Sequence, residues 1–260
     1  MNNTLSLNKN QVDVWQAFPM QLQDPSTLAQ LQSLVTVEEH QTILQCKRPL
    51  ERHTKLVTRA LARYALAKYL TVDPLEIVFK KSLHGKPSIA SPECELSFNL
   101  SHSADFVMCA ITKQAQIGID VEKIRYKPSL LKMGETVFNQ QELTDIASFT
   151  GPAQHRRFFD YWTLKESFVK ATGAGLTTPL QSITCQPGHI KAQLQLATEF
   201  IDRDKHWQCY LWPISQQHRL AITLDKQHPE PTDIRCFHFF PATSNTLFDV
   251  APSEPLPLSA

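Results

Sequence analysis

Two short segments constrain the fold of this chain more than any other feature. The first, GIDVE at residues 118–122, alternates like a β-strand, in which a step of two residues returns a side chain to the same face. The second, WTLKESFVK at residues 162–170, has helical spacing and places Trp162, Glu166 and Lys170 along one stripe. Two acids on one strand face, with an acid and a lysine on one helix face, could hold a hard cation against a phosphate.

The strand acids, Asp120 and Glu122, also have a simpler interpretation, because polar residues on a half-exposed strand are usually its solvated face. The apolar run that precedes them, Ile117 to Ile119, favours a functional pair, since it would carry the acids out of a core. The glycine within that run would also allow another backbone to approach closely. The strand alone leaves both interpretations open.

The helix acid is ambiguous in the same way. Glu166 and Lys170 stand at i and i+4 and could be a solvated ion pair. Phe168 and Val169, however, indicate that the helix is packed on its other sides, and Glu166 shares the stripe of Trp162. A partly buried acid needs a partner, and a metal ion would serve.

The composition is typical of a soluble globular protein and gives no global attraction to polyanions. Of 260 residues, 42% are hydrophobic and 20% are charged, which is enough for one large core or two smaller ones. The net charge of +1 and the pI of about 7.7 argue against a nucleic-acid-binding protein. Because Met1 to Asn10 lack a signal-peptide pattern and no apolar run could span a membrane, we expect a cytoplasmic protein.

Several common catalytic and binding patterns are absent from the sequence. The six cysteines are scattered and form no C-x-x-C pair, which argues against a zinc site or a disulfide framework and favours idle thiols. The seven glycines form neither G-x-G-x-x-G nor a phosphate-binding loop, and neither G-x-S-x-G nor H-E-x-x-H occurs. Any phosphate chemistry must therefore use a different arrangement.

Hydrophobic periodicity predicts a helix followed by strands on each side of about residue 115. Before that point, the predicted elements are a helix over 50–70 and strands over 77–79, 96–100 and 106–112. After it, the predicted elements are a strand over 117–122 that forms a hairpin with the previous one, helices over 128–133, 140–149 and 151–173, and strands over 183–185, 207–212, 219–224 and 234–240. We therefore expect an α+β fold of two halves, over 1–115 and 116–240, with a loosely ordered, proline-rich tail over 241–260.

Two further clusters could bind phosphate. Ser101 and Ser103 flank His102 after a predicted strand, and two hydroxyls beside a cationic imidazole could grip a phosphate, although such a histidine is more often structural. A basic helix face is either solvated or, with nearby lysines, able to bind a polyanion such as a nucleotide 3′-phosphate. The residues of that face are Arg52, Lys55, Arg59 and Arg63, and the lysines are Lys80, Lys81 and Lys86.

Taken in order, these motifs resemble those of the 4′-phosphopantetheinyl transferases. Residues 118–122 and 162–170 resemble the two signature motifs of that family, and their surroundings resemble its larger, monomeric type, which serves carrier-protein assembly lines. The likeness extends to residues 85–87, 98–103, 138–142 and 173–176, and it covers roughly residues 45–225. Each motif alone is weakly diagnostic, whereas the ordered set is specific.

The resemblance implies an activity, a fold and a metal site. Such enzymes transfer the phosphopantetheine arm of coenzyme A to a serine of an apo acyl, peptidyl or aryl carrier protein and release adenosine 3′,5′-bisphosphate. The implied fold is a pseudo-twofold pair of α+β halves with the coenzyme A site between them, complete in a monomer. Mg²⁺ would be held by Asp120, Glu122 and Glu166 and would bridge the pyrophosphate.

The resemblance also implies which residues bind coenzyme A. Lys86, Ser101 and His102 would line its site, with His102 at the 3′-phosphate. Arg52 and Thr54 match, more loosely, family positions that contact the nucleotide.

For catalysis, Glu166 is the candidate base that takes the serine proton, with Glu142 in reserve, and Lys170 would contact the pyrophosphate and stabilise the leaving phosphate. Two alternatives stay open, a degenerate relative that binds coenzyme A or a carrier without transfer, and a metal-dependent phosphodiesterase. The identity of the carrier is not encoded, but we expect it to dock on apolar residues between Arg125 and Phe149.

Overall fold

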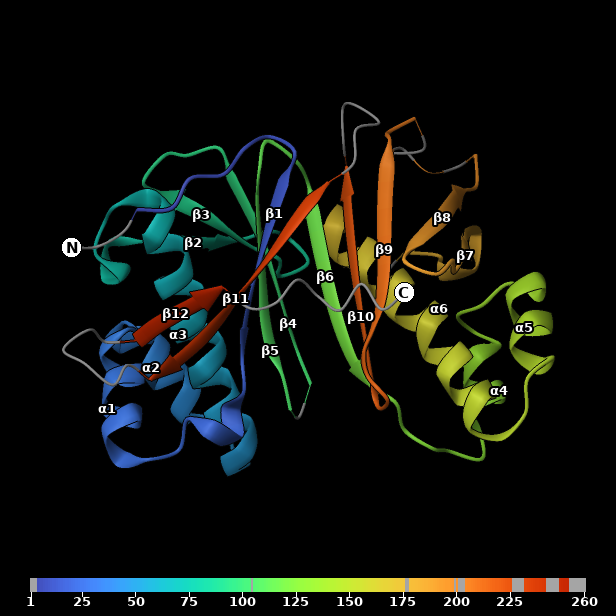
Figure 1. The fold of residues 1–260 in the computed structure, drawn as a ribbon, viewed down its shortest axis with the longest axis horizontal. Helices are drawn as coiled ribbons and strands as arrows, with labels where there is room; N and C mark the ends of the chain where they lie inside the picture. The colour runs from blue at the N-terminus through green and yellow to red at the C-terminus, as the bar shows by residue number, and fades with distance from the viewer. Residues whose placement is uncertain are drawn as a thin grey trace. The chain divides into compact units, whose positions relative to one another are not determined.

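The chain folds into two compact units in the computed structural model, which describes residues 4–103, 105–175, 178–198, 200, 204–225, 232–241 and 248–252. The first unit comprises Met1–Gln114 and Pro231–Leu256, and the second comprises Ala115–Glu230 and Pro257–Ala260. Each unit contains a long helix and a five-stranded sheet (Figure 1). The prediction of an α+β protein made of two α+β halves is therefore confirmed.

In the first unit, helix α3 packs against three strands of a sheet with the order β12-β11-β1-β5-β4. Trp15 on β1, Leu61 on α3 and Ile111 on β5 are fully buried where these elements meet. The elements are β1 Gln11–Ala17, η1 Pro19–Gln21, α1 Pro25–Ser33, α2 Val37–Leu44, α3 Pro49–Leu70, η2 Pro74–Glu76, β2 Val78–Lys81, β3 Pro87–Ser91, β4 Leu96–His102, β5 Val107–Lys113, β11 Asp233–Pro241 and β12 Phe248–Pro252.

In the second unit, helix α6 packs along a sheet with the order β6-β10-β9-β8-β7. Its core joins Leu164 and Phe168 of α6 to Phe138, which precedes α5, and all three side chains are fully buried. The elements are β6 Ile117–Lys123, α4 Leu130–Gly134, α5 Gln140–Ala147, α6 Gly151–Thr172, η4 Leu180–Ser182, β7 Ile183–Gln186, β8 Lys191–Leu196, β9 Trp207–Ser215 and β10 His218–Asp225.

Helix α6 begins and ends where its sequence predicts. Proline occupies the first turn, where its missing N–H removes no hydrogen bond. Gly173 ends the helix with a φ of 70°, which glycine adopts without steric cost, and its amide donates to the Val169 carbonyl at 2.9 Å. The helix has 22 residues and is therefore about 33 Å long. In the described part of the chain, no helix is both long and apolar enough to cross a membrane.

The predicted hairpin of strands 106–112 and 117–122 is wrong. The first of these strands, β5, pairs with β1 on one edge and with β4 on the other, so it has no edge left for β6. Strand β6 pairs instead with β10 of the second unit. The polar segment 113–116 is therefore the connection between the units, and Gln114 in it has a positive φ of 57°.

The boundaries predicted after residue 230 also need correction. Strand β11 was expected in the second half, but it pairs in parallel with β1, with Val12 opposite Ile234, and so belongs to the first unit. The tail was expected to be loosely ordered, but residues 248–252 form β12, which pairs antiparallel with β11. Residues 242–247 and 253–260 lie outside the described part of the chain.

A buried carboxylate holds the returning strand in the first unit. Asp13 on β1 is fully buried and accepts hydrogen bonds from Arg235 Nε at 2.8 Å and from Tyr69 Oη at 2.6 Å. Arg235 NH2 lies 2.7 Å from Asp13 Oδ2, so the ion pair is bidentate. Tyr69 also accepts a hydrogen bond from Trp15 Nε1 at 2.9 Å. The network joins β1, α3 and β11 around one buried carboxylate.

Replacing Arg235 with methionine tests this network. The change leaves the Asp13 carboxylate buried without its bidentate partner, which should lower the free energy of unfolding by about 2–3 kcal/mol, as measured by urea denaturation. The value lies below that of a fully enclosed pair because the Arg235 side chain is 38% exposed. Lys113→Met, which breaks a surface pair with Glu95, is the control and should cost under about 0.5 kcal/mol. Equal effects of the two changes would show that the Asp13 pair does not hold β11.

Candidate functional site

Helix α6 and strand β6 of the second unit approach each other closely at Gly118. A Cβ atom added to Gly118 would lie 1.9 Å from the Ser167 carbonyl oxygen and 2.4 Å from the Ala171 amide nitrogen. Both are backbone atoms of α6, which cannot move aside as a side chain can. Only glycine at this position therefore allows the helix and the strand to lie at this distance. The close approach predicted for this glycine is confirmed.

This contact brings the two sequence motifs together. Lys170 Nζ lies 2.6 Å from Asp120 Oδ1, and Trp162 Nε1 donates to Glu122 Oε1 at 3.0 Å. From Tyr161 to Lys170, only Trp162, Glu166 and Lys170 are partly exposed, and every other residue is buried. The predicted stripe on α6 and the predicted acid face on β6 are therefore one surface.

Burial and mutual repulsion make two of the acids on this surface hard to ionise. Burial, followed by the charge of Asp120, raises the pKa of Glu122 to about 7. The same two causes, in the same order, raise the pKa of Glu166. Asp120 is itself buried. Asp120 thus raises the pKa of two neighbouring carboxylates, and Lys170 is a cation in contact with it.

These residues fit magnesium in the chemistry of their donor atoms. Carboxylate oxygens are hard ligands, and Mg²⁺ is usually held by one or two of them, with water and substrate phosphate filling its other positions. Within the described residues, no group of three or more His, Cys, Asp or Glu side chains lies close enough to hold an ion by itself. The three-ligand set of Asp120, Glu122 and Glu166 therefore stays a prediction.

The residues predicted to bind coenzyme A by resemblance lie in the first unit, apart from Lys170. Ser101 is buried and His102 is exposed at the end of β4. Lys86 precedes β3, and burial lowers the pKa of its ammonium group to about 8. A partly desolvated ammonium group gains from a nearby anion, which is compatible with a phosphate ligand.

The other two predicted coenzyme residues are tied to the backbone near the start of α3. Arg52 donates from Nε and NH2 to the Cys46 carbonyl, at 3.2 and 2.8 Å. Thr54 is buried, and its hydroxyl donates to the Leu50 carbonyl at 2.9 Å. These contacts fix both side chains within α3 and the turn before it.

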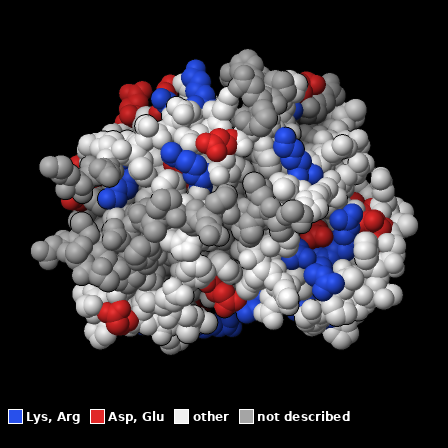
Figure 2. All heavy atoms as spheres, in the orientation of Figure 1, with Lys and Arg blue, Asp and Glu red and all other residues white. Residues whose placement is uncertain are grey.

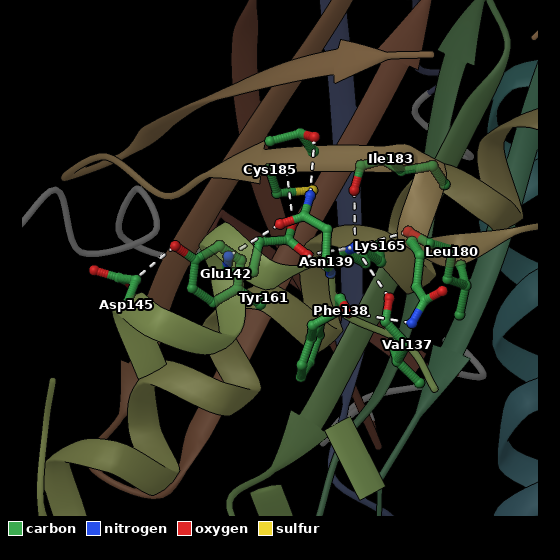
Figure 3. Close-up of polar contacts among 12 residues, drawn as sticks. Val137, Phe138, Asn139, Glu142, Asp145, Tyr161, Lys165, Leu180, Ile183 and Cys185 are labelled. Carbon is green, nitrogen blue, oxygen red and sulfur yellow. Dashed lines mark hydrogen bonds and ion pairs between the residues drawn. The ribbon is translucent and has the colours of Figure 1, made fainter. Parts of the chain in front are cut away.

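Glu142, predicted as a reserve base, lies in the core instead. Its carboxylate is 1% exposed and lies 2.6 Å from Lys165 Nζ. It also accepts hydrogen bonds from the amides of Asn139 at 3.0 Å and Cys185 at 2.8 Å (Figure 3). A carboxylate enclosed by three donors has no open oxygen for a serine hydroxyl, so the structure indicates a structural role for Glu142.

The anchoring of Lys165 is a feature that the sequence analysis missed. Lys165 falls on the stripe of Phe158, Tyr161 and Phe168, which are apolar or aromatic and buried. A lone charge on such a stripe signals a buried, paired residue, because an unpaired charge there would be too costly. In the sequence, Lys165 stands beside Glu166 and near Lys170, a pattern that is also typical of a solvated helix face.

The surface of the protein carries both signs of charge. On the face shown in Figure 2, basic and acidic side chains are interspersed, in keeping with a net charge of +1. One open groove of the second unit, of about 680 Å³, is lined by Tyr126, Arg156, Arg219 and four residues of the β9–β10 turn region, Pro213, Ser215, Gln216 and Gln217. Arg219 stands opposite Glu122 in the pairing of β10 with β6 and binds Asp160 of α6 at 2.6 Å. Through Arg219, the groove therefore lies next to Glu122 along the sheet.

Comparison with known proteins gives one consistent family. A sequence model of the 4′-phosphopantetheinyl transferase superfamily matches residues 116–223, and one of the 4′-phosphopantetheinyl transferase N-terminal region matches residues 22–114. A 4′-phosphopantetheinyl transferase of Bacillus subtilis is 30% identical over 209 residues, which are 78% of this chain and 87% of the relative. A phosphopantetheinyl transferase of Thraustochytrium sp. is 32% identical over 214 residues, which are 77% and 73% of the two chains. The transferase HetI of Nostoc sp. is 32% identical over 177 residues, which are 66% and 73% of the two chains.

Gly118→Ala should separate helix α6 from strand β6. Because the new methyl group would meet backbone atoms at 1.9 and 2.4 Å, the free energy of unfolding should fall by about 3 kcal/mol, as measured by urea denaturation. Gly151→Ala on the same helix is the matched control. A Cβ there would meet nothing within 4 Å, so only its φ of 56° is unfavourable and the cost should be about 1 kcal/mol. A Gly118→Ala protein as stable as the control would contradict the tight contact.

Proposed function

The chain belongs to the 4′-phosphopantetheinyl transferase superfamily, and we propose that it transfers the phosphopantetheine arm of coenzyme A, with Mg²⁺, to a serine of an apo carrier protein. The observation that carries this proposal is the shared surface of β6 and α6. There, Lys170 contacts Asp120 at 2.6 Å and Trp162 contacts Glu122 at 3.0 Å, beside the partly exposed Glu166. Such a surface suits a divalent cation and the phosphates that it binds.

The reaction needs charge neutralisation and positioning more than covalent help from the protein. The serine hydroxyl oxygen attacks the phosphorus that carries the pantetheine arm. The bond from that phosphorus to the bridging oxygen of the pyrophosphate breaks, and adenosine 3′,5′-bisphosphate leaves with the bridging oxygen. When bound, Mg²⁺ would be held by Asp120, Glu122 and Glu166 and would neutralise the charge of the pyrophosphate. Lys170 would add positive charge at the leaving phosphate.

The proton of the serine must go to a base as the new bond forms. We assign that role to Glu166, directly or through a water molecule, because its carboxylate is partly exposed and burial raises its pKa toward the range in which a base is useful. The buried ion pair of Glu142 with Lys165 supports Glu166 over Glu142 in that role. Glu166 would thus serve both as a ligand and as the base.

For coenzyme A itself, we assign the phosphate contacts to Lys86, Ser101 and His102, with Arg52 and Thr54 at the nucleotide. Lys86 supports this assignment by its partly desolvated ammonium group, and His102 by its exposed position at the end of β4. A lysine and an imidazole are suited to phosphate recognition when they can approach it directly.

For the carrier protein, we assign the docking surface to the segment between β6 and α6. It presents exposed apolar side chains in Tyr126, Leu131, Met133 and Phe149, which is unusual for so short a stretch of soluble surface. The groove beside Tyr126 also contains Arg219, which stands opposite Glu122, so a carrier seated on this segment could present its serine near that acid.

Incubation with coenzyme A, Mg²⁺ and an apo acyl or peptidyl carrier protein tests the function. We expect the carrier to gain the mass of one phosphopantetheine arm and to lose this gain when its serine is replaced by alanine or EDTA is added. Binding of coenzyme A with no mass gain would favour a degenerate binding protein. Cleavage of coenzyme A without labelling of the carrier would favour a metal-dependent phosphodiesterase.

The pH dependence of coenzyme A binding tests Lys86. Its pKa of about 8 means that the ammonium group loses its proton, and its attraction for phosphate, as the pH rises through 8. Affinity for coenzyme A, measured by calorimetry, should therefore fall by up to about tenfold between pH 7 and pH 9. Lys86→Met should bind weakly with a flatter pH profile, and the exposed Lys191→Met should behave as the wild type. An identical pH profile in the wild type and Lys86→Met would remove Lys86 from the site.

A further inference from the structure

Lys165 is a fully buried lysine in the middle of helix α6. Its ammonium group donates to the carbonyls of Leu180 at 2.7 Å, Ile183 at 2.8 Å and Val137 at 3.1 Å. The carboxylate of Glu142 lies 2.6 Å away. Figure 3 shows Lys165 pointing from α6 toward these groups. The ammonium group of Lys165 thus donates to three carbonyls, and the Glu142 carboxylate balances its charge. These partners lie on separate segments of the chain.

Glu142 completes this cluster from the opposite side. Its Oε1 accepts from the Cys185 amide on β7, and its Oε2 accepts from the Asn139 amide at the start of α5. Lys165 and Glu142 therefore tie α6 to two other segments, residues 137–142 and residues 180–185. Each contact has a fixed direction, unlike an apolar contact, which tolerates sliding.

The neighbour of Lys165 in the sequence is Glu166. Consecutive residues of a helix point about 100° apart, so a fixed direction of Lys165 sets the direction of Glu166. On a neighbouring face of the helix, Lys170 and Trp162 contact the acids of β6. The rotation of α6 about its axis is thus defined from two sides, and Glu166 lies on the stripe between Trp162 and Lys170.

We propose that Lys165 and Glu142 form a positioning pair that orients Glu166 for metal binding and proton transfer. This inference rests on the proposed function of Glu166. Stability alone does not account for the pair, because a buried ion pair replaced by apolar groups of similar size is often neutral or even stabilising. Its directional contacts instead specify one rotation of α6.

A double-mutant cycle separates positioning from stability. The paired replacement Lys165→Met with Glu142→Gln removes both charges together, while the glutamine oxygen can still accept from Cys185. We expect kcat to fall at least about tenfold, with coenzyme A affinity in the absence of Mg²⁺ unchanged, and Mg²⁺ affinity in the presence of coenzyme A to fall in parallel. In a Glu166→Gln background, the same replacement should cost less than about twofold, because the residue that it positions is already lost.

The control is an ion pair of the first unit that lies outside the assigned site, Arg235 with Asp13 at 2.7 Å. Arg235→Met with Asp13→Asn should lower kcat little and equally in both backgrounds. If the paired replacement at 165 and 142 does not fold, the milder Glu142→Gln enters the same cycle.

Full turnover in a folded variant, or an equal loss in the Glu166→Gln background, would overturn the positioning role. Failure of the wild type to label the carrier would overturn the proposed function instead.

Discussion

The contact of α6 with β6 at Gly118 is the constraint on which the rest of the site depends. With no side chain at this position, two backbones meet at a distance that a single methyl group would prevent. The contact places the stripe of Trp162 and Lys170 directly against Glu122 and Asp120. A wider separation would leave four polar side chains on two unrelated surfaces. A steric property of one residue thus determines whether the acids act together.

The same helix is fixed on a second face by charges that play no part in that surface. Lys165 and Glu142 bond to backbone carbonyls and amides of residues 137–139 and 180–185. On the first face, burial and the repulsion of Asp120 raise the pKa values of Glu122 and Glu166. Partly buried acids that repel one another destabilise the site when it is empty. Binding of a cation that neutralises them is therefore favourable. The buried cluster of Lys165 and Glu142 holds α6 in place against the segments around it, which such a site requires.

Local patterns predicted the elements that form this site, because they depend on periodicity and caps. The limits of α6, its partly exposed stripe and the role of Gly118 all follow from residues within a short stretch. The pairing of β11 with β1 could not be predicted in that way, since Asp13 and Arg235 meet across 222 positions. Glu142 was also misjudged, because a sequence does not show that a distant lysine will enclose a carboxylate. Likewise, β5 seemed free to pair with β6 because its long-range partner β1 had not been predicted.

The most direct measurement of the central claim is a crystal structure of the protein with coenzyme A and Mg²⁺. The account predicts that the ion lies between the pyrophosphate and the acids of β6 and α6, bound by at least two of Asp120, Glu122 and Glu166. It also predicts that α6 keeps its contact with Gly118 and that Lys165 keeps its contact with Glu142. An ion bound by other residues, or a helix α6 rotated so that Glu166 points away from Asp120, would contradict it.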